Sequence, residues 1–175
     1  MKIKNYTFKN QDNLTASLYD KVLFAKLGID KEVVQDSHPL SYTAGTLRGL
    51  HFQAPPCAQG KLVRCGRVSF FDVAVDIRRG SPSFGKWQDF YISATNGHQV
   101  YIPVGFAHGV VTLEPDTEIV YKLTDYYAPE TEGAVRWDGC GIDWPLSGDP
   151  ILSDKDAIAP ALADYDSYFI YGENS

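Results

Sequence analysis

The stretch Leu47-Arg48-Gly49-Leu50-His51-Phe52-Gln53 places one cation and one imidazole within an apolar run. In a β-strand, successive side chains point to opposite faces of the sheet, so Arg48 and Leu50 are predicted to share one face and Gly49 and His51 the other. From about residue 33 onward, further short runs rich in Val, Ile, Phe and Tyr are broken at close intervals by Gly, Pro, Asn and Asp. This pattern predicts an all-β sandwich or barrel.

Six apolar runs downstream of this stretch are predicted strands, because they are short and rich in β-branched and aromatic residues. They cover Leu62–Cys65, Val68–Ile77, Gln88–Ile92, Val100–Ile102, Gly109–Leu113 and Thr117–Leu123. Apolar residues near helical spacing predict one short helix over Lys21–Gly28, and Asp154–Leu162 predicts a second, laid over the barrel. The expected fold is an antiparallel double-stranded jelly roll with a few short peripheral helices.

Length and composition predict one domain in a cytoplasmic protein. A chain of 175 residues suits a single domain, expected to span residues 1–175. Three cysteines without a CxxC pair favour reduced thiols over a disulfide framework or a zinc site. The N-terminus has no pattern of a secretory leader, and no apolar run has the length of a membrane span. A formal net charge of −6 argues against a nucleic-acid-binding surface.

Seven blocks of sequence carry a resemblance to a known family. They are LRGLHFQ, QGKLVR, FDVAVDIRRGSPSFGKW, YIPVGFAHG, YKLTDYYAPE, GIDWPL and ILSDKD, in this order. The chain from about Val33 to Asp156 is similar to the dTDP-4-dehydrorhamnose 3,5-epimerase family, nucleotide-sugar epimerases of the cupin superfamily. The resemblance implies a cupin barrel, usually a homodimer, and an isomerase that inverts C3, C5 or both in a nucleotide-linked 4-keto-6-deoxyhexose. It also implies a place in deoxysugar synthesis, for rhamnose, O-antigen or lipopolysaccharide.

Epimerisation beside a ketone needs a base to remove a proton, a group to stabilise the enolate oxygen and an acid on the opposite face. By the resemblance, His51 matches the base, and Asp156 the carboxylate that orients its imidazole, with Asp154 as the alternative. Tyr121 matches the acid, and Lys61 the cation beside the enolate oxygen. Each of these residue types also occurs for packing or solvation alone, so the assignments depend on the matching motifs.

The resemblance also implies residues that hold the substrate, a nucleotide-diphosphate sugar. Arg48 and Gln35 match groups that bind the diphosphate, and a guanidinium fits phosphate geometry in a bidentate way. Asp72 and His108 match two polar positions near the sugar ring, where they are expected to form a supporting pair. Tyr126 is a further candidate contact, with packing as an equal alternative.

Two departures from the family pattern fall on the nucleotide side of the expected site. Family members carry a D-x-R-G-x-F segment ahead of the helix, whereas the corresponding residues 9–19 contain neither Arg nor Phe. A Q-D-N motif before the base strand is replaced by Gln35-Asp36-Ser37. The proton chemistry is therefore expected to be retained, while the nucleotide is dTDP, as in the common case, or CDP or another.

Several alternatives remain at this point. The same base and acid can invert C3 alone or C5 alone, and a 3,4-ketoisomerase on the same barrel also moves protons beside a carbonyl. A sugar-binding cupin module would need no proton donor. A metal-dependent cupin such as a dioxygenase needs two histidines one residue apart and a carboxylate soon after. Because His38, His51, His98 and His108 show no such spacing, we expect no metal and no cofactor.

Overall fold

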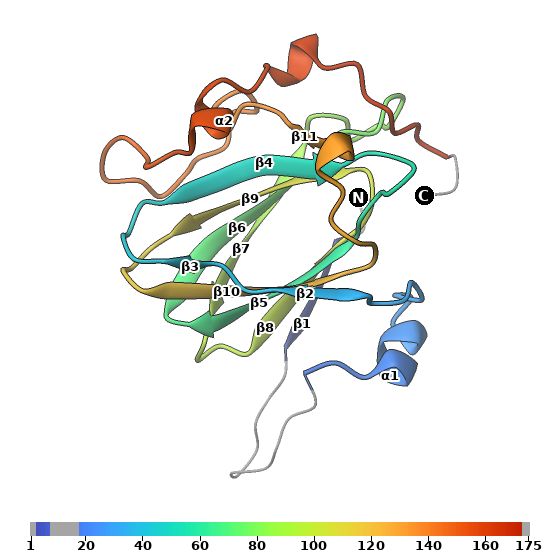
Figure 1. The fold of residues 1–175 in the computed structure, drawn as a ribbon, viewed down its shortest axis with the longest axis horizontal. Coiled ribbons are helices and arrows are strands. Elements are labelled where there is room, and N and C mark those ends of the chain that lie inside the picture. Colours follow the sequence, from blue (N-terminus) through green and yellow to red (C-terminus); the bar gives the residue numbers. More distant parts are fainter. Residues whose placement is uncertain (1–2, 8–17, 173–175) are drawn as a thin grey trace.

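The computed structural model describes residues 3–7 and 18–172, which form two antiparallel sheets packed face to face (Figure 1). The strands are β1 (Lys4–Thr7), β2 (Gln35–Ser37), β3 (Leu40–Ser41), β4 (Leu47–Gln53), β5 (Lys61–Arg67), β6 (Ser69–Asp76), β7 (Trp87–Ser93), β8 (His98–Ile102), β9 (Phe106–Thr112), β10 (Thr117–Leu123) and β11 (Glu132–Ala134). One sheet has the order β1-β8-β5-β10-β2, with β3 also paired to β10; the other has the order β11-β4-β9-β6-β7. This arrangement confirms the all-β jelly roll.

The predicted strands are all present, with small differences at their ends. The largest difference is in β9, which begins at Phe106 rather than Gly109, because the turn through Val104 and Gly105 already completes the reversal there. The sequence pattern does not predict β1, β2, β3 or β11. Strands this short contain too few residues for alternation to be visible.

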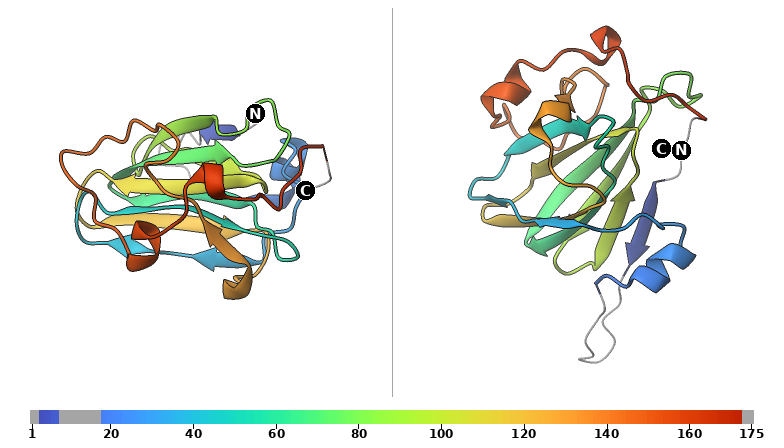
Figure 2. Two further views of the ribbon diagram at one scale, coloured as in Figure 1. Left: turned by 90° about the horizontal axis from the view of Figure 1, so that it is seen from above. Right: turned by 45° about the vertical axis from the view of Figure 1, so that its right-hand side comes forward.

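Alternation along the strands divides the buried side chains into an inner and an outer core. Between the sheets, Phe70, Val100 and Ile119 belong to a core that both sheets contribute. On the outer face of the sheet that contains β4, Leu50 and Trp144 belong to a second core. The chain that follows β11 runs over this outer face, as the orange and red segments of Figures 1 and 2 show. Polar side chains that face inward from either sheet can therefore meet between them.

The first predicted helix is confirmed as α1 (Lys21–Lys26). Asp20 caps its N-terminus by accepting two backbone N–H bonds at 2.9 and 3.0 Å. Phe24 is buried and belongs to a small cluster with Leu62 and Tyr101, so the helix packs on the outer face of the sheet that contains β5. The segment expected to differ from the family, residues 9–19, lies almost entirely outside the described residues.

The second predicted helix is shorter than expected. It begins at the predicted residue as α2 (Asp154–Ala157), with the Ser153 side chain as its N-cap, but the prediction of a helix as far as Leu162 is wrong. The residue before Pro160 is restricted to extended backbone, which ends the helix early. Two single-turn 3₁₀ helices complete the set, η1 (Pro129–Thr131) and η2 (Leu162–Asp164). In the described part of the chain, no helix is long and apolar enough to span a membrane.

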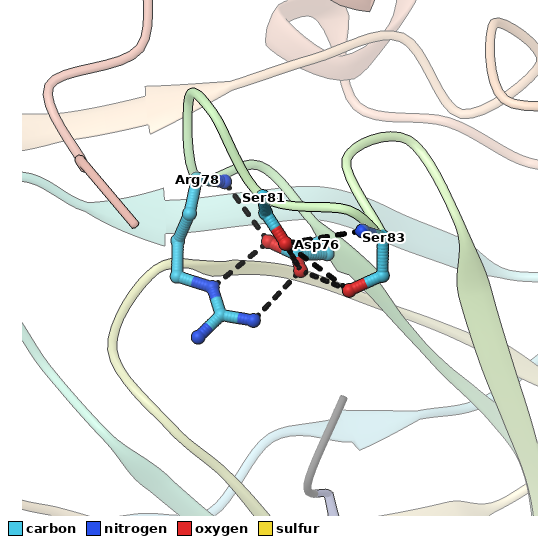
Figure 3. A network of polar contacts seen from close by, with 4 residues as sticks. All are labelled: Asp76, Arg78, Ser81 and Ser83. Carbon is cyan, nitrogen blue, oxygen red and sulfur yellow. Dashed lines mark hydrogen bonds and ion pairs between the residues drawn. The ribbon is translucent and has the colours of Figure 1, made fainter. Parts of the chain in front are cut away.

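A buried carboxylate fixes the loop that follows β6 (Figure 3). Asp76 accepts hydrogen bonds from the backbone N–H and the guanidinium of Arg78 at 2.7 to 3.0 Å, and from the hydroxyls of Ser81 and Ser83 at 2.7 Å. Burial alone would raise the pKa of this carboxyl, but the bonds from Arg78 and the serines outweigh it and lower the pKa to about 2. The Arg78 guanidinium also lies 4.6 Å from the ring centroid of Phe106. These contacts hold the loop against the barrel.

Strand β4 does not alternate as predicted. Arg48 pairs with Val110 and His51 with His108, so three steps along β4 oppose two steps along β9. The extra residue is a β-bulge, which turns Arg48 and His51 toward the same side of the sheet. Leu50 points the other way, into the outer core. The prediction that Arg48 shares a face with Leu50 is therefore wrong.

Candidate active site

A cavity of about 310 Å³ lies between the two sheets. Strands of both sheets and helix α2 contribute to its wall, so it gathers residues from distant parts of the chain. Its titratable side chains are Arg48, His51, Lys61, His108, Tyr121, Tyr127, Glu132, Lys155 and Asp156. Six of the nine site residues predicted from the sequence are among them, and a seventh, Asp72, contacts one of these six.

His51 and Asp156 form a hydrogen-bonded pair at one wall of the cavity. The distance from His51 Nε2 to Asp156 Oδ1 is 2.5 Å, and the two side chains are 19% and 2% exposed. Burial would raise the pKa of Asp156, but the bond to His51, the charge of His51 and the bond from Ser153 lower it below the ordinary value. The carboxylate is thus ionised and holds the imidazole by one nitrogen. The alternative residue, Asp154, is exposed.

Tyr121 reaches the cavity from the other sheet, on β10. Burial and the negative charge of Asp72 raise the pKa of its phenol, and the charge of Arg48 counteracts only part of this effect. The phenol therefore keeps its proton at neutral pH. Its ring meets that of His108 edge to face, with centroids 5.8 Å apart and an interplanar angle of 85°.

A second imidazole–carboxylate pair lies beneath the cavity. His108 on β9 and Asp72 on β6 are 4% and 0% exposed, and their Nε2 and Oδ2 atoms are 2.8 Å apart. Because each strand alternates, both side chains point into the space between the sheets. Burial lowers the pKa of His108, although the charge and hydrogen bond of Asp72 act in the opposite direction. The imidazole is therefore held neutral.

Lys61 brings a cation to the same cavity from the start of β5. Burial lowers the pKa of its ammonium to about 8, while the nearby carboxylates of Glu132 and Asp72 limit the shift. The side chain is thus still largely charged at neutral pH but loses its proton more readily than a lysine in solvent. A partly desolvated cation acts more strongly on a developing negative charge than one in water.

Arg48 and Gln35, expected to hold the diphosphate, and Tyr126, the further candidate substrate contact, are placed differently from one another. Arg48 lines the cavity, and its Nε and Nη2 donate to the Ser41 hydroxyl at 3.4 and 3.3 Å. Gln35 is outside the cavity wall, and its side-chain oxygen accepts a bond from the backbone N–H of Tyr127 at 2.9 Å. Tyr126 is 66% exposed and does not line the cavity, whereas its neighbour Tyr127 does.

Sequence reasoning missed three cavity residues that contact one another. Glu132 accepts from the Lys155 ammonium at 2.8 Å and from the Tyr127 hydroxyl at 3.1 Å. These contacts join β11, the loop after β10 and helix α2 at the wall of the cavity. Tyr127 and Lys155 each adjoin a residue that the sequence did single out, whereas Glu132 follows the YKLTDYYAPE block and no motif marks it.

No cluster suited to a metal ion is present among residues 3–7 and 18–172. Within this part, no three or more His, Cys, Asp or Glu side chains gather closely enough to coordinate one. The two histidines of the cavity are each engaged with a carboxylate through Nε2. The described groups of the site are an imidazole bonded to a carboxylate, a phenol, a cation and a second, neutral imidazole.

The chain was also compared with known proteins. Residues 1–164 match the family model described as dTDP-4-dehydrorhamnose 3,5-epimerase. A relative of that name from Sinorhizobium fredii is 49% identical over 150 residues, which are 85% of this chain and 77% of the relative.

Solved structures show the same fold with nucleotide sugars bound. A dTDP-6-deoxy-D-glucose-3,5-epimerase from Legionella pneumophila, in complex with dTDP-4-keto-L-rhamnose, has a TM-score of 0.86 and 39% identity, over 94% of this chain and 89% of that one. A 3′-monoepimerase from Streptomyces bikiniensis, in complex with dTDP-quinovose, has a TM-score of 0.82 and 31% identity, over 92% and 83% of the two chains.

Proposed function

The chain belongs to the dTDP-4-dehydrorhamnose 3,5-epimerase family and is an isomerase that epimerises a nucleotide-linked 4-keto-6-deoxyhexose, and we propose that His51, Asp156, Lys61 and Tyr121 carry the reaction. The observation that carries this proposal is the position of the His51–Asp156 pair and of Tyr121 on different sheets around one cavity. Inversion of a carbon requires proton removal and return on opposite faces. A base and an acid on two walls meet that requirement.

His51 is the general base. Its imidazole removes the proton from the carbon beside the ketone, and the electron pair of the broken C–H bond forms the enolate. Asp156 is hydrogen-bonded to one ring nitrogen, so it fixes the ring and stabilises the imidazolium that forms. The carboxylate does not need to take up the proton.

Lys61 and Tyr121 complete the exchange. The Lys61 ammonium stabilises the negative oxygen of the enolate, and Tyr121 gives its proton to the opposite face of the same carbon. The phenolate that results is stabilised only weakly in a buried site, because burial raises the pKa of Tyr121. After Tyr121 has given its proton to the carbon, it therefore takes up another proton promptly from solvent. Solvent also removes the proton that His51 took from the substrate.

We propose dTDP as the nucleotide of the substrate. The support is that the Legionella and Streptomyces structures hold dTDP sugars and share the fold over most of this chain. Arg48 is the cavity residue placed to bind the diphosphate, with Gln35 and Tyr126 as more distant candidates. CDP remains the alternative, because residues 9–19 depart from the family pattern.

We propose inversion at both C3 and C5. The two carbons flank the C4 ketone, so one base and one acid can serve each of them when the ring turns in the cavity. The similarity to a 3′-monoepimerase makes inversion at C3 alone the second candidate.

Deuterium wash-in tests the function directly. The purified protein is incubated in heavy water with dTDP- and CDP-linked 4-keto-6-deoxyglucose, and deuterium at C3 and C5 is followed separately by NMR. Exchange at both carbons with inversion is expected, faster with the dTDP sugar. Exchange at C3 alone identifies a monoepimerase, and movement of the carbonyl to C3 identifies a ketoisomerase. Binding without any exchange would contradict the proposal and leave a sugar-binding module; His51→Ala is the control for background exchange.

The domain organisation, the oligomeric state, the location and the pathway are also proposals. We expect residues 1–175 to act as one domain, since the family model spans nearly all of them. We further expect a homodimer in the cytoplasm, working in deoxysugar synthesis for surface polysaccharides, as the family resemblance predicts. Sedimentation analysis of the purified protein tests the dimer.

A further inference from the structure

The loop that follows β10, residues 124–128, crosses from one sheet to the other beside the cavity (Figure 1). It leaves β10, which pairs with β5, and leads through η1 to β11, which pairs with β4. Within this crossing loop, Tyr127 lines the cavity, and its hydroxyl donates to Glu132 at 3.1 Å. The position of the crossing loop therefore decides where one wall of the cavity stands.

Gln53 holds the crossing loop by its backbone. Its buried side-chain amide donates from Nε2 to the carbonyl of Tyr126 at 2.9 Å and to the carbonyl of Cys57, while Oε1 accepts from the backbone N–H of Ala128 at 2.9 Å. A primary amide has two N–H donors and one acceptor oxygen. Both donors and the oxygen are thus engaged, so Gln53 has no donor left for a substrate although it adjoins the cavity.

Two further glutamines hold the same loop. Gln59 donates from Nε2 to the carbonyl of Asp125 at 2.7 Å, and Oε1 of Gln35 accepts from the backbone N–H of Tyr127 at 2.9 Å. Gln53 ends β4 in one sheet, whereas Gln35 begins β2 in the other, so the loop is held from both sheets. Of these four bonds to the loop, Gln53 makes two, and it is the buried member of the set. Gln53 is therefore the glutamine whose loss would release the loop most.

A loop that is already ordered lowers the cost of binding. Without these bonds the loop would sample many conformations, and ordering it on binding would reduce the affinity. When only a fraction of the molecules has the wall in place, the apparent dissociation constant rises by the reciprocal of that fraction. The chemical step is unaffected, because every bound complex has the wall in place. Loss of Gln53 is therefore expected to change KM and not kcat.

We propose that Gln53 is a positioning residue that fixes the crossing loop before the substrate binds, so that Tyr127 forms a permanent wall of the cavity and not a mobile lid. Gln53 acts through the loop and does not touch the reacting sugar. The proposal rests on the proposed function only in that the substrate occupies this cavity. A merely structural glutamine would support the barrel and leave the affinity for the substrate unchanged.

The first test is steady-state kinetics of Gln53→Met with dTDP- or CDP-linked 4-keto-6-deoxyglucose, whichever the wild-type protein epimerises. Methionine has a similar size but no N–H donor and only a weakly accepting sulfur. KM is expected to rise by about tenfold, as when about a tenth of the molecules has the loop in place, while kcat stays within about twofold of wild type. Gln53→Glu tests for rescue. Its carboxylate accepts from Ala128 but donates only when protonated, so its KM relative to wild type is expected to improve as the pH is lowered.

Gln99→Met is the matched control, because Gln99 is a second buried glutamine, on β8, that does not line the cavity. It is expected to lower stability and to leave KM unchanged. An unchanged KM in folded Gln53→Met would overturn the proposal, as would an equal rise in Gln99→Met or a fall in kcat at unchanged KM. If the wild-type protein epimerises neither sugar, the proposed function fails instead, and the second test still decides the position of the loop.

The second test needs neither substrate nor variant. Hydrogen exchange of the ligand-free wild-type protein, followed by NMR, reports whether the backbone N–H groups of Tyr127 and Ala128 are protected. Both are expected to exchange at least about 100-fold more slowly than in an unstructured peptide, because glutamine oxygens hold them. Exchange close to the rate of an unstructured peptide would show that the loop is ordered only by the substrate and would refute the proposal.

Discussion

His51 Nε2 lies 2.5 Å from Asp156 Oδ1, although 105 positions separate the two residues in the chain. His51 reaches this position because the bulge in β4 turns it toward the cavity, and Asp156 because Ser153 caps the short helix α2. The contact therefore depends on the bulge in strand β4 and on the capped start of helix α2.

The pair predicts a graded response to mutation. His51→Ala is expected to lower kcat by about 10⁴-fold, because it removes the base. Asp156→Asn is expected to lower kcat by about 10²-fold, because the imidazole remains but loses its orientation and its counter-charge. Steady-state kinetics measures both, with circular dichroism as the check on folding. Wild-type kcat in Asp156→Asn would show that Asp156 takes no part in the reaction.

Tyr121→Phe is expected to separate proton exchange from inversion. The base can still remove a proton and return a deuteron to the same face, but the donor on the other face is gone. Inversion should therefore fall by about 10²- to 10⁴-fold while deuterium wash-in with retained configuration persists. NMR in heavy water reads both quantities in one experiment. Normal inversion by the variant would exclude Tyr121 as the acid.

Lys61 predicts a basic limb in the pH–rate profile. Burial lowers the pKa of this ammonium from 10.5 to about 8, and the charged form is the one that stabilises the enolate. In the free enzyme, kcat/KM is therefore expected to be highest where Lys61 is fully charged and to fall as the pH rises through about 8. Lys61→Gln should be slower at every pH and should lack the limb. A limb that persists unchanged in Lys61→Gln would have to arise from another group.

Asp76→Asn is expected to destabilise the barrel by about 3 kcal/mol, because Arg78 loses its buried partner. The pKa of Asp76 is about 2 and lies below its ordinary value of 3.8, so the folded state favours the ionised form. The stability that the carboxylate contributes is thus present above about pH 4 and lost as the pH falls toward 2. Urea unfolding at pH 7 and pH 3 measures both effects. The difference between wild type and variant should be smaller at pH 3.

Gly49→Ala is expected to destabilise the fold by about 2 to 3 kcal/mol. A Cβ atom at this position would lie 2.5 Å from the Gly109 backbone of the adjacent strand, and Gly49 has a φ of +147°. Gly45→Ala is the matched control for positive φ, because no atom lies within 4 Å of its Cβ position. Thermal unfolding should show the larger loss for Gly49→Ala. Equal losses would mean that backbone conformation, and not the close approach of β9, decides the cost.

The sequence by itself determined the class of the fold and the inward direction of most of the site. Apolar runs broken by turn residues predicted the strands of a jelly roll. Side chains alternate between the two faces of a strand, and this alternation can be recognised in the local sequence. The pairing of β6 with β9 is regular, and the register of β5 with β10 shifts only between Glu118 and Ile119, so Lys61, Asp72, His108 and Tyr121 face the same interior. The family motifs then indicated epimerisation as the reaction that these interior side chains could carry out.

Only the tertiary structure decided the rest. An extra residue in β4 reverses which residues share a face, and register between strands is a property of the pair and not of either sequence. The proline that ends α2 early is present in the sequence, whereas the contact of that helix with His51 was predicted only through the family resemblance. Contacts such as that between Glu132 and Lys155 arise where segments distant in the chain are packed together, so local sequence cannot contain them.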